Sequence, residues 1–162
     1  MAKVKPLPEG THTLTAQLVV KGAAKAIDYY KKAFDAKELT RFEGPDGKIM
    51  HASIRIGDSQ VFLCDEMPEM NSLSPTTLGN TPLVMTLYTE NSDAVFKRAV
   101  DAGAQVKMPM EDQFWGDRCG TLKDPHGYTW TIATHKEDLT PQEMQQRQAE
   151  WMKQFAPQSA HG

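Results

Sequence analysis

Apolar positions follow two different periods along the first third of the chain. Residues 14–20 form an apolar run typical of a strand. Residues 23–34 then space apolar side chains as one face of a helix does, at Ala26, Ile27, Tyr30 and Phe34. Three strand-like runs follow, divided by two turns that contain glycine. The pattern predicts a βαβββ unit from about residue 13 to 66.

The second half of the chain repeats this plan. The segment YKKAFDA at residues 30–36 reappears as FKRAVDA at residues 96–102, again inside a predicted helix that follows an apolar run. Three more strand-like runs come after it, so a second βαβββ module is predicted over about residues 82–135. Residues 67–81 are rich in proline, serine, asparagine and glycine, which is typical of a linker or mobile flap.

A further helix is predicted over residues 140–155. Thr140, Pro141 and Glu143 form the sequence of a capping box with proline at the first helical position. The helix has few apolar residues, so we expect it to lie across a surface or a partner subunit. The whole chain, 1–162, is interpreted as one α+β domain made of two modules and this helix.

Composition and charge narrow the classes of function. The chain is 40% hydrophobic and 24% charged, with a net charge of -3 and scattered basic residues, so neither nucleic acid nor a membrane is an expected partner. The N-terminal residues lack the apolar core of a signal peptide, and we expect a cytoplasmic protein. Cys64 and Cys119 lie far apart without Cys-x-x-Cys spacing, which argues against a zinc knuckle and favours reduced thiols.

The two modules carry motifs that resemble one known superfamily. AKAIDYYKKAF, PDGKIMHASIRIGDS, DAVFKRAVDAGAQV, DQFWGDR and DPHGYTWTIATH resemble the vicinal oxygen chelate superfamily, which contains glyoxalases, bleomycin-resistance proteins and dioxygenases, and within it the PhnB-like branch. The resemblance implies a cup-shaped, eight-stranded mixed sheet around a cavity, commonly in a homodimer. Whether the modules pair within one chain or between two chains stays open.

The resemblance also implies where a divalent metal would bind. Enzymes of the superfamily hold it with histidine and glutamate side chains on the first and last strands of each module. The corresponding positions here offer no strong metal donor: Thr15 or Leu18, Leu63, Val84 and Thr131. His12 lies three residues before Thr15, an odd offset that turns it to the opposite face of a strand. We therefore predict no cofactor, although a divalent metal on atypical ligands is not excluded.

Strand alternation assigns candidate residues to the cavity. If Met50, Ala52, Ile54 and Ile56 face the helices, then His51, Ser53 and Arg55 face the cavity. The equivalent strand of the second module presents Asp117, Cys119, Thr121 and Lys123. His51 and Cys119 would then form a pair that activates a thiol nucleophile, or else serve as an ordinary wall residue and a small packing residue.

The segment DQFWGDRCGTLKDPHGYTW holds further candidates. Asp117 and Arg118 either grip a polar ligand or staple neighbouring strands. Phe114 and Trp115 either form a cavity lip or belong to a core or dimer interface. We expect Trp130 in the core and His126 exposed in its turn. Thr131 stands where a metal-binding carboxylate is expected.

Three functions follow from these observations. The leading hypothesis is a metal-free homodimeric binding protein for a small, partly aromatic molecule held at His51, Ser53, Arg55, Phe114, Trp115, Asp117, Arg118, Cys119 and Thr131. The alternative is an enzyme of lyase or dioxygenase type, with atypical metal ligands or metal-independent chemistry. A third hypothesis is a protein-interaction unit that uses the C-terminal helix.

Overall fold

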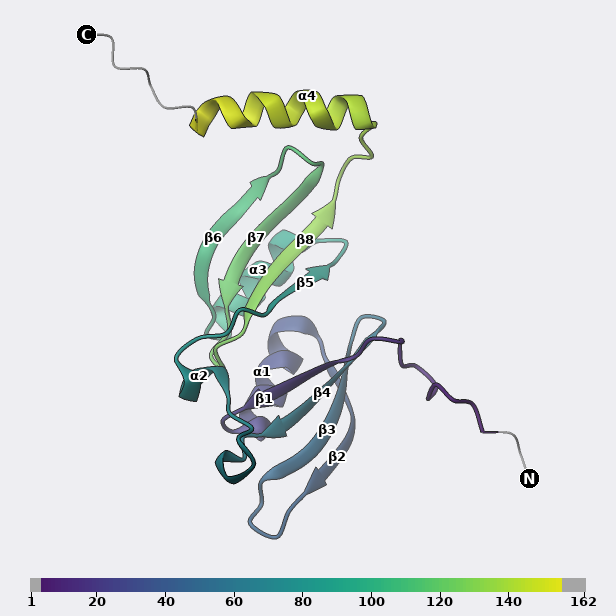
Figure 1. The fold of residues 1–162 in the computed structure, drawn as a ribbon, viewed down its shortest axis with the longest axis vertical. Helices are drawn as coiled ribbons and strands as arrows, with labels where there is room; N and C mark the ends of the chain where they lie inside the picture. The colour runs from purple at the N-terminus through teal and green to yellow at the C-terminus, as the bar shows by residue number, and fades with distance from the viewer. Residues whose placement is uncertain (1–3, 156–162) are drawn as a thin grey trace.

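The computed structural model describes residues 4–155 (Figure 1). The first module is a four-stranded sheet in the order β1-β4-β3-β2, with β1 and β4 parallel and the other pairs antiparallel. One helix follows its first strand. The elements are β1 (Ala16–Val20), α1 (Ala23–Phe34), β2 (Lys37–Glu43), β3 (Ile49–Ile56) and β4 (Ser59–Asp65).

The second module repeats this topology with the sheet order β5-β8-β7-β6. The α+β fold of paired βαβββ modules with a C-terminal helix is therefore confirmed, and the eight strands form two sheets of four. The elements are β5 (Val84–Tyr88), α3 (Ser92–Asp101), β6 (Gln105–Asp112), β7 (Asp117–Lys123) and β8 (Thr129–His135).

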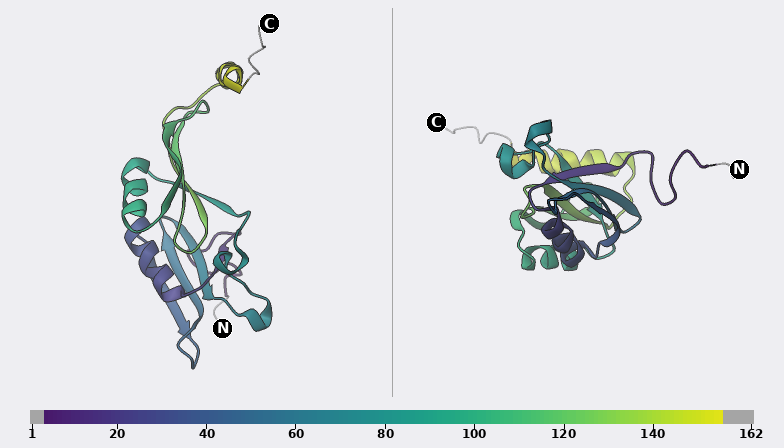
Figure 2. Two further views of the ribbon diagram at one scale, coloured as in Figure 1. Left: turned by 90° about the vertical axis from the view of Figure 1, so that its left-hand side faces the viewer. Right: turned by 90° about the horizontal axis from the view of Figure 1, so that it is seen from below.

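The core lies between the sheets and the two long helices. α1 and α3 lie in line along the same side of the two sheets and contact each other (Figure 2). Strand alternation sends Leu18, Ile54, Leu63, Leu122 and Ile132 to this side, where each is fully buried. We call the opposite side of each sheet, which neither of these long helices covers, its helix-free side.

One residue departs from the predicted alternation. Met50 is 40% exposed, whereas Ile49 is buried at 1% exposure. The register between β2 and β3 shifts between the pairs Phe42 with His51 and Glu43 with Ile49, and such an irregularity changes which side chain faces the core. The prediction that Met50 faces the helices is therefore wrong, and Ile49 takes that place.

A buried carboxylate joins the two modules. Asp124, in the turn before β8, accepts hydrogen bonds from the Tyr30 hydroxyl of α1 at 2.8 Å and from Trp130 Nε1 at 2.9 Å. Trp130 is 3% exposed, as expected for the core. His126 is 8% exposed because its ring packs beside the rings of Tyr29 and Tyr30, so the prediction of an exposed histidine is wrong. This burial lowers the pKa of His126.

The segment between the modules is organised by one acidic side chain. Glu66 accepts hydrogen bonds from the backbone N–H and hydroxyl of Ser74 and from the hydroxyl of Thr77. Ser74 is fully buried and caps a short helix, α2 (Pro75–Leu78), which follows the single turn η1 (Pro68–Met70). These hydrogen bonds hold the pKa of Glu66 at about 2, below its usual 4.5.

The C-terminal helix α4 (Pro141–Met152) lies beyond the end of the second sheet and continues into the turn η2 (Lys153–Phe155) (Figure 1). The predicted capping box is present, since Thr140 and Glu143 bond each other's backbone N–H groups. No residue of α4 is buried. Within the described part of the chain, no helix has the length and apolar character needed to cross a membrane.

Candidate functional site

A large cavity lies between the edge strands of the two sheets, β1 and β5. Its volume is about 930 Å³, and we call it the inter-sheet groove. Polar groups stand at intervals along an otherwise apolar wall. The apolar side chains include Leu14, Ala16, Val61, Leu83, Met85, Leu87 and Trp130, and the polar ones include His12, Gln17, Gln60, Thr86 and Tyr88.

None of the nine predicted ligand-binding residues lines the inter-sheet groove. The groove forms only because α1 packs on α3 and brings two edge strands together, which is a tertiary arrangement without a local sequence signal. One weak signal is present in hindsight: Leu14, Leu83, Val84 and Tyr88 put large apolar or aromatic side chains at strand ends, where they stay exposed.

A polar cluster adjoins the groove at Tyr88. The Tyr88 hydroxyl donates to Asp117 at 2.8 Å, and Trp115 Nε1 donates to the same carboxylate at 3.1 Å. Nδ1 of His135 lies 2.7 Å from the other carboxylate oxygen. Asp117 itself is only 6% exposed. We call these four residues the Asp117 cluster; Tyr88 and His135 were not among the predicted site residues.

The hydrogen bonds of the Asp117 cluster change the acidity of its members. Burial acts to raise the pKa of Asp117, but the bonds from His135, Tyr88 and Trp115 outweigh it and hold the pKa below its usual value. The bond to Asp117, with a second to Asp138, raises the pKa of His135. The cluster therefore favours an ionised carboxylate beside a protonated imidazole, and it fixes the Tyr88 ring at the end of the groove.

His51 and Cys119 do not form a pair within one chain. His51 lies on β3 of the first sheet, where its ring packs 5.0 Å from that of Phe62, and Cys119 lies on β7 of the second sheet. Burial, with the nearby charge of Asp117, raises the pKa of the Cys119 thiol. The predicted alternative of a thiol activated by histidine is wrong for the single chain, because an activated thiol requires a lowered pKa.

Arg118 of β7 connects α3 and β6 within the second module. Its guanidinium makes two bonds of 2.7 Å to Asp93, at the start of α3, and a third of 3.3 Å to Asp112. The side chain therefore points to the helix side of the sheet, away from Asp117 and Cys119. The two predicted roles for Arg118 were to grip a polar ligand or to link neighbouring elements, and its contacts in the structure fit the second role.

Phe114 and Trp115 lie in the loop between β6 and β7 and do not line the inter-sheet groove. The Phe114 ring is 5.0 Å from that of Trp115 and 5.2 Å from that of Trp151 on α4. Phe114 and Trp151 line a second cavity, of about 580 Å³, between this loop and α4. Phe114 thus connects the C-terminal helix to the sheet, and Trp115 belongs to the Asp117 cluster.

The residues at the family's metal positions do not fit a divalent cation. Leu18 and Leu63 face the helices and are fully buried. Val84 offers no donor atom, and the hydroxyl of Thr131 lies 3.3 Å from that of Thr121. Within residues 4–155, no three histidine, cysteine, aspartate or glutamate side chains gather in a way that would hold a metal. The expectation that the protein works without a metal stays a prediction.

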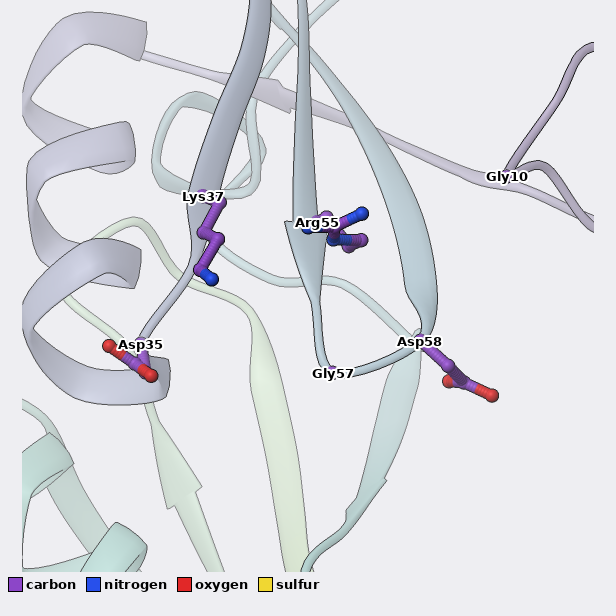
Figure 3. Close-up of a pocket in the computed structure, with 6 residues that line it drawn as sticks. All are labelled: Gly10, Asp35, Lys37, Arg55, Gly57 and Asp58. Carbon is purple, nitrogen blue, oxygen red and sulfur yellow. The ribbon is translucent and has the colours of Figure 1, made fainter.

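A smaller hollow lies in front of the first sheet, beside the inter-sheet groove. It has a volume of about 350 Å³ and is lined by Gly10, Asp35, Lys37, Arg55, Gly57 and Asp58 (Figure 3). Gly57 and Asp58 also line the inter-sheet groove, so the two spaces adjoin. Arg55 is the predicted site residue that lines a cavity next to the groove. Ser53, two residues before it on the same face of β3, is buried and its hydroxyl has no hydrogen-bond partner among the described residues.

Comparison with known proteins identifies one matching family and several relatives. The family model described as "Glyoxalase/Bleomycin resistance protein/Dioxygenase superfamily" matches residues 11–132. An uncharacterized protein of Mycobacterium bovis is 47% identical over 135 residues, which cover 82% of this chain and 89% of that protein. Protein YjdN of Escherichia coli is 28% identical over 79% of this chain and 84% of its own length.

Two solved structures of bacterial proteins show the same fold. TioX from Micromonospora sp. ML1 matches with a TM-score of 0.62 and 25% identity, covering 76% of this chain and 98% of that one. TnmS3 from Streptomyces sp. CB03234, described as an antibiotic binding protein, matches with a TM-score of 0.56 and 22% identity, covering 77% and 96%. The second likeness concerns the fold alone.

Proposed function

The chain belongs to the glyoxalase/bleomycin resistance protein/dioxygenase superfamily, and from this premise we propose that it is a binding protein for a small, partly aromatic molecule. The observation that carries the proposal is the inter-sheet groove of about 930 Å³, whose walls are mostly apolar. This size and this lining are typical of pockets for small organic ligands. A protein of the same fold, TnmS3, is described as binding an antibiotic.

Two properties of the chain favour binding over the chemistry of the superfamily's enzymes. The positions that hold the metal in those enzymes are occupied by leucine, valine and threonine, which are poor ligands for a divalent cation. The thiol of Cys119 has a raised pKa, and its predicted partner His51 lies on the other sheet. Membership of the PhnB-like branch and a cytoplasmic location stay predictions from the sequence.

We further propose that the protein is a homodimer. The helix-free sides of both sheets present large apolar side chains to solvent, among them Phe42 at 66% exposure and Met108 at 55%. α4 adds the exposed Trp151, Met152 and Phe155. Burying such surface against a second copy is favourable at about 25 cal/mol per Å² of apolar area. The sheet of a second copy would also cover the helix-free sides, which one chain leaves exposed.

Ligand binding is tested by calorimetric titration of the full chain with a panel of aromatic molecules, including peptide antibiotics. We expect at least one ligand whose affinity falls tenfold or more in Thr86→Trp, because the indole fills the groove that Thr86 lines. Thr40→Trp, an exposed threonine on β2 outside the groove, is the matched control and should bind normally. A panel without any binder, or a binder unaffected by Thr86→Trp, contradicts the proposal.

The dimer is tested by the mass of the protein in solution. We expect the full chain to have twice the mass of one copy, and truncation after Leu139 to weaken the association if α4 contributes to it. A monomeric full chain at micromolar concentration contradicts the homodimer. An unchanged dimer after truncation would remove α4 from the interface.

A further inference from the structure

The hollow beside the inter-sheet groove has a charge pattern that narrows the chemistry of the ligand. We propose that the ligand carries an anionic group, a carboxylate or a phosphate, which Lys37 and Arg55 bind while the apolar body occupies the groove. The inference rests on the proposed function for the apolar part of the ligand. It adds a second subsite with two named cationic side chains.

Lys37 and Arg55 lie directly opposite each other on β2 and β3. Both side chains are exposed, and within residues 4–155 neither makes an ion pair or a side-chain hydrogen bond. Neighbouring basic residues are paired: Glu38 on β2 accepts from Lys31 of α1 at 2.6 Å and from Arg41 of β2 at 2.7 Å. Glu38 therefore neutralises Lys31 and Arg41, whereas Lys37 and Arg55 have no acidic partner among the described residues.

This arrangement does not stabilise the sheet. Like charges that face each other across two strands repel, which is destabilising by a few tenths of a kcal/mol up to about 1 kcal/mol. An anion bound between Lys37 and Arg55 would turn this repulsion into attraction for both side chains. A pair that costs stability in the free protein and gains a partner on binding is typical of a ligand site.

The acidic residues of the hollow leave the two cations free. Asp58 accepts a hydrogen bond from the Ser59 hydroxyl at 2.8 Å, and in Figure 3 its carboxylate points away from the Arg55 guanidinium. Asp35 lies on the other side of Lys37, at the end of α1, and forms no ion pair shorter than 4.0 Å with it. Both carboxylates lie at the rim, where water screens them, so they reduce the positive potential without occupying the space between the cations.

The two cations suit an oxyanion. The planar guanidinium of Arg55 donates two parallel N–H groups to a carboxylate or phosphate, and the Lys37 ammonium adds a point charge. Because Gly57 and Asp58 line both the hollow and the groove, a single ligand can place its charge at Arg55 and its apolar body between β1 and β5. The Ser53 hydroxyl, on the same strand face, is an unused polar group nearby. The ligand class is therefore an amphipathic aromatic acid.

The proposal is tested by calorimetry on the full chain with three probes of one shape: 2-naphthoate, 2-naphthyl phosphate and the neutral 2-naphthamide. We expect at least one anionic probe to bind ten times more tightly than the amide, and to lose most of that advantage in Arg55→Gln or Lys37→Gln. Which anion binds better separates a carboxylate subsite from a phosphate subsite. Binding of the anion, and not of the amide, should weaken as salt rises.

The matched control is Arg98→Gln. Arg98 is an exposed arginine on α3, outside the hollow and the groove, and its substitution changes the net charge equally. Arg98→Gln should leave all affinities within twofold. If the amide and the anions bind with equal affinity, and Arg55→Gln does not change that affinity, the anionic subsite is overturned and the groove proposal still stands. Anions whose affinity depends on Arg55 but not on Thr86→Trp contradict the groove and leave the anionic subsite standing. If none of the three probes binds, the anionic subsite is overturned, and the groove is judged by the wider panel of aromatic molecules.

Discussion

The helix-free faces of the two sheets have the same strand plan but different polar contents. In the second module, Asp117 gathers the donors of Tyr88, Trp115 and His135, so the polar groups satisfy one another. In the first module, Lys37 and Arg55 face each other without a partner in the described chain. The duplicated framework therefore fixes the strands and the buried side, while the open faces have diverged: one is organised internally and the other is available for a ligand.

The largest effect that the comparison predicts is the loss of the Asp117 carboxylate. Asp117→Ala removes the buried acceptor that Tyr88, Trp115 and His135 share, and we expect the free energy of unfolding to fall by about 2 kcal/mol, a moderate figure because the three donors themselves reach solvent. Denaturant unfolding measures this. Asp58→Ala, which removes an exposed carboxylate from the first module's hollow, should change stability by less than about 0.5 kcal/mol. Equal losses of unfolding free energy in Asp117→Ala and Asp58→Ala would contradict the difference that we infer between the two faces.

The order of helices and strands along the chain was predictable because it depends on local periodicity. Alternation in β3 sends Ala52 and Ile54 to the core and His51 and Arg55 outward, as the structure shows. The same reasoning failed at Met50, because a register irregularity in the β2–β3 ladder is set by pairing and leaves no mark on the composition.

The site itself was less predictable than the fold. The groove depends on how α1 and α3 pack, and this brings together β1 and β5 from opposite halves of the chain. His126 was misplaced for a similar reason: its Asp-Pro-His-Gly turn is usually a surface feature, but here it packs against Tyr29 and Tyr30 of the other module. Contacts between modules are not encoded in the pattern of either one.

The two cysteines sharpen the comparison, because one lies on each sheet. Burial raises the pKa of both Cys64 and Cys119. In the single-thiol variants Cys64→Ser and Cys119→Ser, we expect iodoacetamide to react with the remaining thiol of the folded chain at least about tenfold more slowly than in the urea-unfolded chain. Mass spectrometry over time gives the rates. A fast Cys119 in the folded protein would mean that its environment activates the thiol, contrary to the structure.

Glu66, in the segment between the modules, is a second carboxylate that accepts several hydrogen bonds, so its contribution to stability can be compared with that of Asp117. At neutral pH, Glu66→Gln should lower the free energy of unfolding by about 1 kcal/mol, a modest figure because the side chain is partly exposed to solvent. The pKa of Glu66 is lowered from 4.5 to about 2, so its contribution is complete above pH 4.5 and is lost as the pH falls toward 2. Urea unfolding at several pH values should show the two proteins converging in acid. Glu69→Gln, an exposed glutamate in η1, should track the wild type throughout.

The smallest expected effect has the opposite sign. If Lys37 and Arg55 are kept for a ligand rather than for the sheet, then Arg55→Thr should leave the unliganded protein as stable as before, or more stable by up to about 0.5 kcal/mol. Threonine suits a strand, and the substitution removes the repulsion across the β2–β3 ladder. Denaturant unfolding without ligand gives the answer, with Arg41→Thr as the contrasting variant, because Arg41 is bonded to Glu38 and Glu43. A loss of 1 kcal/mol or more in Arg55→Thr would show that Arg55 supports the fold, and the distinction between the two faces would then disappear.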